Sequence, residues 1–289
     1  MLKYDSIAEL VNEAEKRGLK LSELVLKTQA AMTEKTEEEM FATMERSLQV
    51  MKESVQDGLD KRSASGLTGG DAYKLNEALK AGKNIAGHFF GNAMMKAVAV
   101  AQTNACMGRI VASPTAGSCG ILPSALLTLQ EEKNISDKDL VMALFTASAV
   151  GIVIATNASV AGAAGGCQAE CGAASAMAAA AMVELCGGTP KQCEHACAIA
   201  LKNILGLVCD PVAGLVEIPC IKRNAGGVGN ALVAAELALA GVESHIPADE
   251  VIVAMKKIGD TMSSTLKETA EGGLAVTPTG KKLCEKVFG

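Results

Sequence analysis

An uncharged run in the middle of the chain is the feature that most constrains its fold. No charged side chain occurs between residues 140 and 169, and Glu170 is the only one between residues 141 and 182. The most apolar part, Leu140 to Ala155, would rise about 24 Å as a helix, which is short of a membrane hydrocarbon core of about 30 Å. Thr156, Asn157 and a glycine run follow it. We therefore predict a helix buried inside the protein and no membrane partner.

Small side chains dominate the rest of the chain. The 289 residues include 48 alanines and 29 glycines, no Trp and only 2% aromatic residues, so the core must be built from Ala, Val, Leu, Ile and Met in close contact. No alternation of apolar and polar residues between hairpin turns stands out. The sequence predicts an all-α fold: an Ala/Gly-rich helical domain with a central buried helix, long enough for a sizeable core.

The first 60 residues differ from the others because 21 of them are charged. A capping box, Ser6-x-x-Glu9, predicts one helix start, and Thr36 to Asp60 reads as a long amphipathic helix. We expect residues 1–60 to be a charged helical region of the same domain as residues 61–289, which hold the candidate site. Ser63 to Gly70 is rich in Gly and Ser and is interpreted as a linker or flexible loop.

The charge pattern narrows the class of partner. The net charge is −5 and no Lys/Arg-rich run occurs, which argues against nucleic-acid binding. Residues Met1 to Leu21 lack the apolar segment of a signal peptide, so we expect a cytoplasmic protein whose ten cysteines stay reduced. Reduced thiols are candidates for metal ligation, and the partner is expected to be a small molecule.

Four irregular, polar segments interrupt the apolar chain, at residues 113–120, 157–172, 208–220 and 222–229. Each mixes Gly with hydroxyl, amide or thiol groups, which lets backbone N–H groups turn toward a ligand. The first, SPTAGSCG, precedes a helix that we expect to begin near Pro123. Hydroxyls and amides at a helix N-terminus would suit a carboxylate, although an ordinary Gly/Ser loop has the same composition.

The cysteines fall into two groups by their surroundings. Cys167 follows two glycines, Cys209 precedes an Asp-Pro pair and Cys220 follows a proline, so these three lie at backbone breaks where distant sulfurs can converge. Three thiolates with one metal position open would suit a cluster that acts as a Lewis acid. Cys193 and Cys197 share a helix face and could bind zinc, but core packing explains them better.

Several of these segments resemble one family. The motifs are SPTAGSCG at 113–120, NAS followed by AGGCQAECG at 157–172, GLVCDPVAGLVEIPCIKRNA at 206–225 and GGLAVTPTG at 272–280. Together they closely resemble the alpha subunit of the two-subunit, iron-sulfur-dependent L-serine dehydratase. The resemblance runs from about residue 70 to the end, and the 206–225 stretch is its most specific part.

The resemblance implies a lyase that converts L-serine to pyruvate and ammonia, in amino-acid degradation and gluconeogenesis, with a 4Fe-4S cluster and no pyridoxal phosphate. It implies that Cys167, Cys209 and Cys220 hold the cluster, whose fourth iron would ease departure of the serine hydroxyl. It also implies a set of residues around the substrate carboxylate: Ser113, Thr115, Gly117 and Ser118, with Asn157 and Arg223 as neighbours.

The catalytic base is expected on another chain. None of His88, His195 and His245 falls in a motif that indicates a base. In two-subunit relatives the resemblance places a histidine motif on the beta subunit, so we expect this chain to be one half of an active heteromer. Single-chain relatives also carry a cysteine at the extreme C-terminus that caps the fourth iron at rest, and Cys284 departs from that pattern.

Three other readings remain open. A related iron-sulfur enzyme could remove sulfide from L-cysteine through a similar site. The chain could be a helical scaffold subunit with cysteines as core residues, which iron content would test. Pyridoxal-phosphate catalysis is less favoured, because no lysine lies in a recognisable Schiff-base setting.

Overall fold

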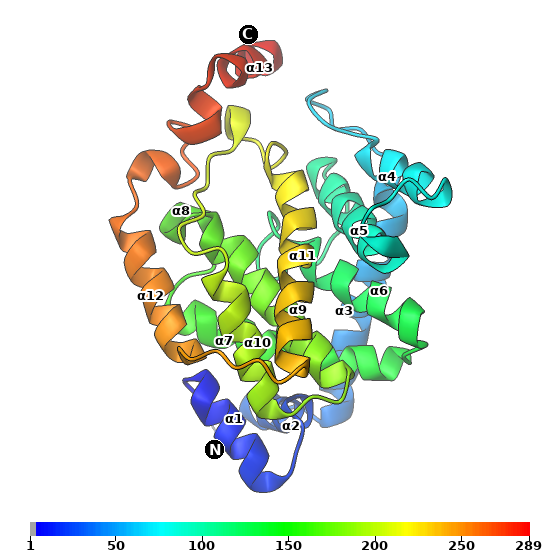
Figure 1. The fold of residues 1–289 in the computed structure, drawn as a ribbon, viewed down its shortest axis with the longest axis vertical. Helices are drawn as coiled ribbons and strands as arrows, with labels where there is room; N and C mark the ends of the chain where they lie inside the picture. Colours follow the sequence, from blue (N-terminus) through cyan, green and yellow to red (C-terminus); the bar gives the residue numbers. More distant parts are fainter. Residues whose placement is uncertain (1–3) are drawn as a thin grey trace.

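The computed structural model describes residues 4–289 and is built from helices (Figure 1). Between residues 4 and 289 no strand forms, and only two isolated bridges occur. The all-α prediction is confirmed. The α-helices are α1 (Ile7–Arg17), α2 (Leu21–Thr33), α3 (Glu37–Gly58), α4 (Asp71–Lys80), α5 (Gly87–Ala105), α6 (Ile121–Lys133), α7 (Asp137–Asn157), α8 (Gly162–Gly165), α9 (Ala173–Leu185), α10 (Pro190–Lys202), α11 (Cys220–Leu239), α12 (Ala248–Thr261) and α13 (Pro278–Phe288).

Four short helical turns complete the chain. Residues Gln168–Gly172 form a π-helical turn, η1, which leads directly into α9. The other three are 3-10 turns: η2 (Val212–Gly214), η3 (Ser264–Leu266) and η4 (Gly273–Val276). Two of them, η1 and η2, lie in irregular segments that the sequence singles out, and η4 lies in the motif at 272–280.

Helix α9 is the centre of the fold. Every residue from Ala173 to Glu184 is buried, and α6, α7, α10 and α11 pack around it (Figure 1). Seven of these twelve residues are alanine, and side chains of this size allow neighbouring helices to approach closely on every side. The sequence predicts the central buried helix at Leu140 to Ala155, which lies in α7; the helix buried along nearly its whole length is α9.

Helix α7 contains the uncharged run that opens the sequence argument. It is the one helix among residues 4–289 that is long and apolar enough, by length and composition, to cross a membrane. It packs on α2, α3 and α9, and 67% of its most apolar 18-residue window is buried within the protein. Burial against other helices is the feature of a core helix, as the sequence predicts.

The N-terminal helices pack directly on the rest of the chain. Helix α3 begins after Thr36, whose side chain accepts a hydrogen bond from Glu39 N, as the amphipathic pattern predicts. Near its end, Gly58 lies so close to α5 that an added Cβ would stand 1.8 Å from Ala99 O. At the start of α1, Asp249 of α12 accepts hydrogen bonds from the N–H groups of the first turn. Buried residues of α1, α2 and α3 thus belong to the same hydrophobic cluster as buried residues of the later helices.

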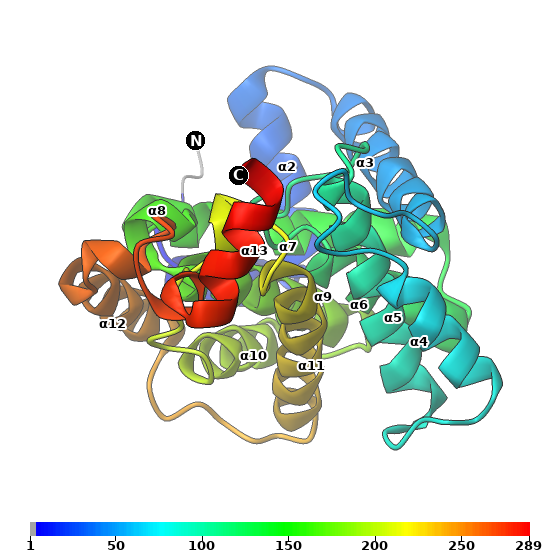
Figure 2. The ribbon, with the colours of Figure 1, turned by 90° about the horizontal axis from the view of Figure 1, so that it is seen from above.

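Residues 222–229, interpreted from the sequence as irregular, instead lie inside the regular helix α11, so that prediction is wrong. The other three segments lie just ahead of α6, around α8 and just ahead of α11. In Figure 1, α1 and α2 lie at the bottom, α8 and the start of α11 lie in the upper half, and α13 lies at the top. The view from above shows α13 crossing over this end (Figure 2). The loop at residues 63–70, interpreted as flexible from its composition, is held here because Ser65 and Thr68 both donate hydrogen bonds to the buried carboxylate of Glu217.

Candidate functional site

Three cysteines from separate segments come together at this end. Cys167 directly precedes η1, Cys209 lies in the extended segment after α10, and Cys220 is the first residue of α11. The charge of each thiolate acts on the others: Cys167 and Cys220 both raise the pKa of Cys209. The structure therefore brings together the three thiols that the sequence singles out.

The pKa values of the three thiols are shifted by burial and by a hydrogen bond from a fourth thiol. Burial raises the pKa of Cys220 to about 12, and it raises the pKa of Cys209 well above its ordinary value. The pKa of Cys167 is instead lowered, mainly because a neighbouring thiol, Cys171, hydrogen-bonds its sulfur. Metal binding at these positions would displace protons from Cys209 and Cys220, since the thiolate is the ligand form.

Arg223 joins the thiols to the loop that carries Cys209. Its guanidinium donates hydrogen bonds to Val208 O and to Asp210 Oδ1, each at 2.8 Å, and its positive charge helps to lower the pKa of Cys167. Asp210 in turn accepts a hydrogen bond from Leu274 N at 2.8 Å. Arg223, which the resemblance places near the substrate, therefore lies beside the thiols, where the positive charge of its guanidinium offsets the negative charge of thiolates.

The C-terminal segment holds the Cys209 loop in place. Cys209 N donates to Leu266 O and Glu268 N donates to Cys209 O, both at 2.9 Å, which makes a short parallel bridge between Cys209 and Lys267. Helix α13 packs on η2, just after Cys209. The GGLAVTPTG motif thus lies beside the cysteine loop, although the two are far apart in the sequence.

The hydroxyl-rich loop at 113–120 forms the other wall of the site. Ser118 is fully buried, and its Oγ lies 3.1 Å from Thr115 Oγ1. Ser113 is 5% exposed, and its Oγ has no hydrogen-bond partner. Gly117 lies beside the Glu170 carboxylate, which a Cβ on Gly117 would approach to 3.2 Å. The four loop residues predicted from the resemblance are therefore adjacent, just ahead of α6.

Glu170 connects this loop to the thiols, and the sequence analysis did not assign it a role. Its Oε1 accepts a hydrogen bond from Thr115 Oγ1 at 2.8 Å, and its Oε2 lies 4.0 Å from Cys209 Sγ. Burial raises the pKa of this carboxyl group. The signal was present: Glu170 is the only charged residue between positions 141 and 182, and such a charge in an apolar core requires partners.

Asn224 is a second residue that the sequence analysis missed. It is fully buried, and its Oδ1 accepts a hydrogen bond from Gly120 N at 2.8 Å. Its Nδ2 donates to Gly117 O at 2.8 Å and to Cys220 O at 2.9 Å. The side-chain amide of Asn224 therefore fixes the hydroxyl-rich loop to the start of α11. Its place beside Arg223 in the KRNA motif was the available signal.

Asn157 has different neighbours from the other predicted site residues. It ends α7, and its amide donates hydrogen bonds to Asp5 O at 2.7 Å and to Val153 O at 2.9 Å. These contacts join it to the N-terminal segment, and no hydrogen bond connects it with the hydroxyl loop. Its predicted place beside the substrate stays a prediction.

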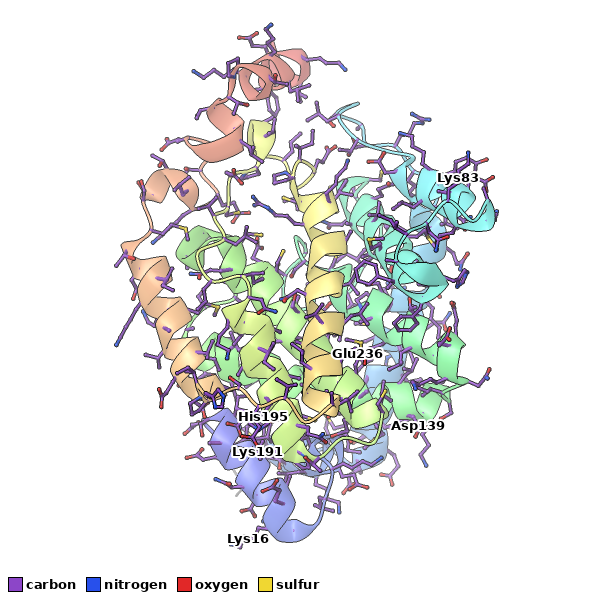
Figure 3. The ribbon with its side chains drawn as sticks, viewed as in Figure 1. Lys16, Lys83, Asp139, Lys191, His195 and Glu236 are labelled. Atoms are coloured by element: carbon purple, nitrogen blue, oxygen red, sulfur yellow. The ribbon has the colours of Figure 1, made fainter. Side chains whose placement is uncertain are left out.

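The three histidines lie outside the group formed by Cys167, Cys209 and Cys220, which we call the thiol cluster. His195 Nδ1 accepts a hydrogen bond from Ser244 N at 3.2 Å, and Figure 3 shows it near Lys191, at the end of the molecule that holds α1. His88 and His245 are exposed. No hydrogen bond in the described part of the chain links any of them to Cys167, Cys209 or Cys220.

The side chains around Cys167, Cys209 and Cys220 must fit the 4Fe-4S cluster that the resemblance implies. Within residues 4–289, no group of three His, Cys, Asp or Glu side chains is arranged to hold a single metal ion. Ligands of a 4Fe-4S cluster bind different irons, so their sulfurs stand farther apart than the ligands of one ion. Two buried thiols, Cys167 and Cys209, and the half-buried thiol of Cys220 come from three segments, and this donor set fits such a cluster.

Comparison with known proteins gives a consistent result. A model of the family described as "Serine dehydratase alpha chain" matches residues 16–275. The chain is 52% identical over 287 residues to a probable L-serine dehydratase alpha chain of Bacillus subtilis, covering 99% of this chain and 96% of that one. It is 45% identical to the L-serine dehydratase alpha chain of Peptoniphilus asaccharolyticus, covering 95% of each.

A longer relative shows the same match in part of its length. The L-serine dehydratase of Streptomyces coelicolor is 40% identical over 275 residues, which is 93% of this chain but only 60% of that protein. The matches with the shorter relatives extend over nearly the full length of both chains. The chain belongs to the serine dehydratase alpha chain family.

Proposed function

We propose that this chain is the alpha subunit of an L-serine dehydratase, a lyase that converts L-serine to pyruvate and ammonia. The observation that carries the proposal is the meeting of three thiols, two of them buried and that of Cys220 half-buried, with a hydroxyl-rich loop to which Glu170 joins them. The names of the relatives support the substrate. Each element of the site corresponds to a requirement of the reaction.

The proposed cofactor is a 4Fe-4S cluster held by Cys167, Cys209 and Cys220. Such a cluster supplies Lewis acidity for the departure of the serine hydroxyl, which is otherwise a poor leaving group. Arg223 lies against Cys167 and offsets the negative charge of the thiolates. The segment around Leu266 holds the Cys209 loop by backbone hydrogen bonds, so the sulfur of Cys209 is fixed before any metal binds.

The hydroxyl loop is proposed to bind the substrate carboxylate. Thr115 and Ser118 share a hydrogen bond, and Ser113 has a buried hydroxyl with no partner in the protein. Hydroxyl donors ahead of a helix N-terminus stabilise an anion. Glu170 acts as a positioning residue, because its carboxylate holds Thr115 Oγ1 at 2.8 Å.

The base that removes the α-proton is proposed to come from a beta subunit. A base must lie within about 2.6–3.2 Å of the proton it removes, or one water away, and His88, His195 and His245 all lie outside the thiol cluster. The active enzyme is therefore a heteromer. We place it in the cytoplasm, where thiols remain available as ligands.

The test begins with the chain purified under nitrogen. We expect about four irons and four sulfides per chain, with their loss in Cys209→Ser and their retention in Cys193→Ser. Cys193 is a matched control, since it is also buried but lies in α10. An intact cluster in Cys209→Ser would refute the ligand assignment, and an iron-free chain would leave a scaffold role.

A second measurement tests the reaction and the division of labour. The chain mixed with its beta subunit should form pyruvate from L-serine, and the chain alone should turn over at least a hundredfold more slowly, since general-base catalysis contributes about 10²–10⁴ in rate. Faster release of sulfide from L-cysteine by the mixture would instead favour the desulfidase reading. Equal rates with and without the partner would place the base on this chain.

A further inference from the structure

Cys171 has no part in the proposed ligand set, yet it lies against one of the ligands. Its Sγ is 3.3 Å from Cys167 Sγ, and both residues are only 3% exposed. All ten cysteines lie within residues 4–289, and this is the one pair joined by a thiol–thiol hydrogen bond. A buried pair of this kind has its own chemistry.

We propose that Cys167 and Cys171 form a reversible disulfide when the chain lacks its cluster and meets a peroxide. The bond would occupy the sulfur of Cys167, so it would also prevent loading with iron until a thiol reduces it. The disulfide follows from the geometry of the pair alone. The block to iron loading rests on the proposed function, because it requires Cys167 to be a ligand.

The backbone at this pair differs from a regular α-helix. Residues four apart on a regular α-helix have Cβ atoms about 5–6 Å apart, whereas a disulfide needs about 3.5–4.5 Å. Cys167 instead caps the N-terminus of the π-helical turn η1 and Cys171 lies within this turn, which is a local departure from regular helix. Their sulfurs are 3.3 Å apart and would have to close by about 1.2 Å to reach disulfide length.

A second pair of cysteines, Cys193 and Cys197, serves as an internal control for the first. Cys193 and Cys197 have the same spacing, lie within the regular helix α10 and are equally buried. No hydrogen bond joins their sulfurs, unlike those of Cys167 and Cys171. Spacing and burial are thus matched between the two pairs, and the helix type and the sulfur contact differ.

The chemistry balances with hydrogen peroxide as the oxidant. One thiol attacks a peroxide oxygen, which gives a sulfenic acid and releases one water. The sulfur of the second thiol then attacks the sulfenic sulfur, forms the S–S bond and releases the second water. Two thiols are oxidised by two electrons in total, and the peroxide is reduced to two waters. A small thiol in excess reverses the bond by exchange.

The experiment uses the full chain, freed of iron by a chelator under nitrogen and then exposed to hydrogen peroxide. Free thiols are alkylated, and the peptides are mapped by tandem mass spectrometry. We expect a peptide that is lighter by two hydrogen atoms than its form with two free thiols, because Cys167 and Cys171 are joined. Cys193 and Cys197 should still be found alkylated. Iron uptake should fall at least tenfold and should recover after treatment with dithiothreitol.

Each outcome has a separate meaning. If Cys167 and Cys171 alkylate after peroxide as fully as Cys193 and Cys197, the disulfide is refuted and the ligand set is untouched. If the bond forms and iron uptake is unchanged, Cys167 is not a ligand, and the proposed function loses that residue. Cys171→Ser provides the last check: it should load iron before peroxide treatment, and any disulfide that still forms at Cys167 in this variant would overturn the pairing.

Discussion

Replacement of Asn224 by alanine tests whether one buried amide joins the two halves of the site. In Asn224→Ala, Gly120 N and Gly117 O lose their partners, which lie at 2.8 Å in the structure. The carbonyl of Cys220 keeps the backbone donor of its helix. Gly120 is buried, and its unsatisfied N–H costs about 1–3 kcal/mol; Gly117 is half-buried, so its carbonyl can turn to water at a smaller cost.

That loss is large beside the total stability of a domain, which is about 5–15 kcal/mol. The assay is urea unfolding of the chain followed by helical circular dichroism, with the KM for L-serine measured on the mixture with the beta subunit. We expect a lower urea midpoint and a raised KM, because the hydroxyl loop would no longer be fixed to α11.

Asn230→Ala is the matched control on the same helix. The Asn230 amide donates to Ala200 O at 2.8 Å, but the residue is only partly buried and lies away from the hydroxyl loop. We expect a loss of about 1 kcal/mol and an unchanged KM. The reasoning is refuted if Asn224→Ala loses no more stability than Asn230→Ala and binds L-serine as the unaltered chain does.

Two further predictions concern burial at other positions. In Gly162→Ala the added methyl would lie 2.8 Å from Glu170 Oε2 and 3.0 Å from Cys209 Sγ. We therefore expect the iron content of the chain to fall while its helical circular dichroism is unchanged. Full iron content would contradict this prediction. Burial lowers the pKa of Lys96, although Glu131 partly offsets it. The unfolded chain therefore binds more protons than the folded chain between the lowered pKa and 10.5, so stability should rise with pH in that alkaline range. Lys96→Met should remove the rise in urea unfolding, and a rise that persists would point to another group.

Local chemistry made the helix boundaries predictable. Ser6 and Thr36 each accept a hydrogen bond from the backbone N–H three residues on, as capping residues do in most proteins. The start of α6 was less well defined, and it lies at Ile121 instead of near Pro123. The cysteines at backbone breaks were also visible in the sequence, since Gly and Pro mark such breaks directly.

The contacts that assemble the site were not visible in the same way. Thr115 and Glu170 are 55 positions apart, and Asn224 reaches Gly120 across 104 positions. Such pairings depend on how α6, α9 and α11 pack, which no local signal encodes. The contact between Cys167 and Cys171 depends on a π-helical turn, and ordinary helical periodicity does not predict one.

The position of α13 has a practical consequence for anyone who purifies this protein. It packs on η2, immediately after the Cys209 loop, whereas α1 lies at the far end of the molecule (Figure 1). A polyhistidine tag fused after α13 would place a row of imidazoles, which are good ligands for iron, beside three thiols. The same tag joined ahead of α1 would be separated from them by the length of the protein. Metal analyses of the chain are therefore best made with the tag at the N-terminal side.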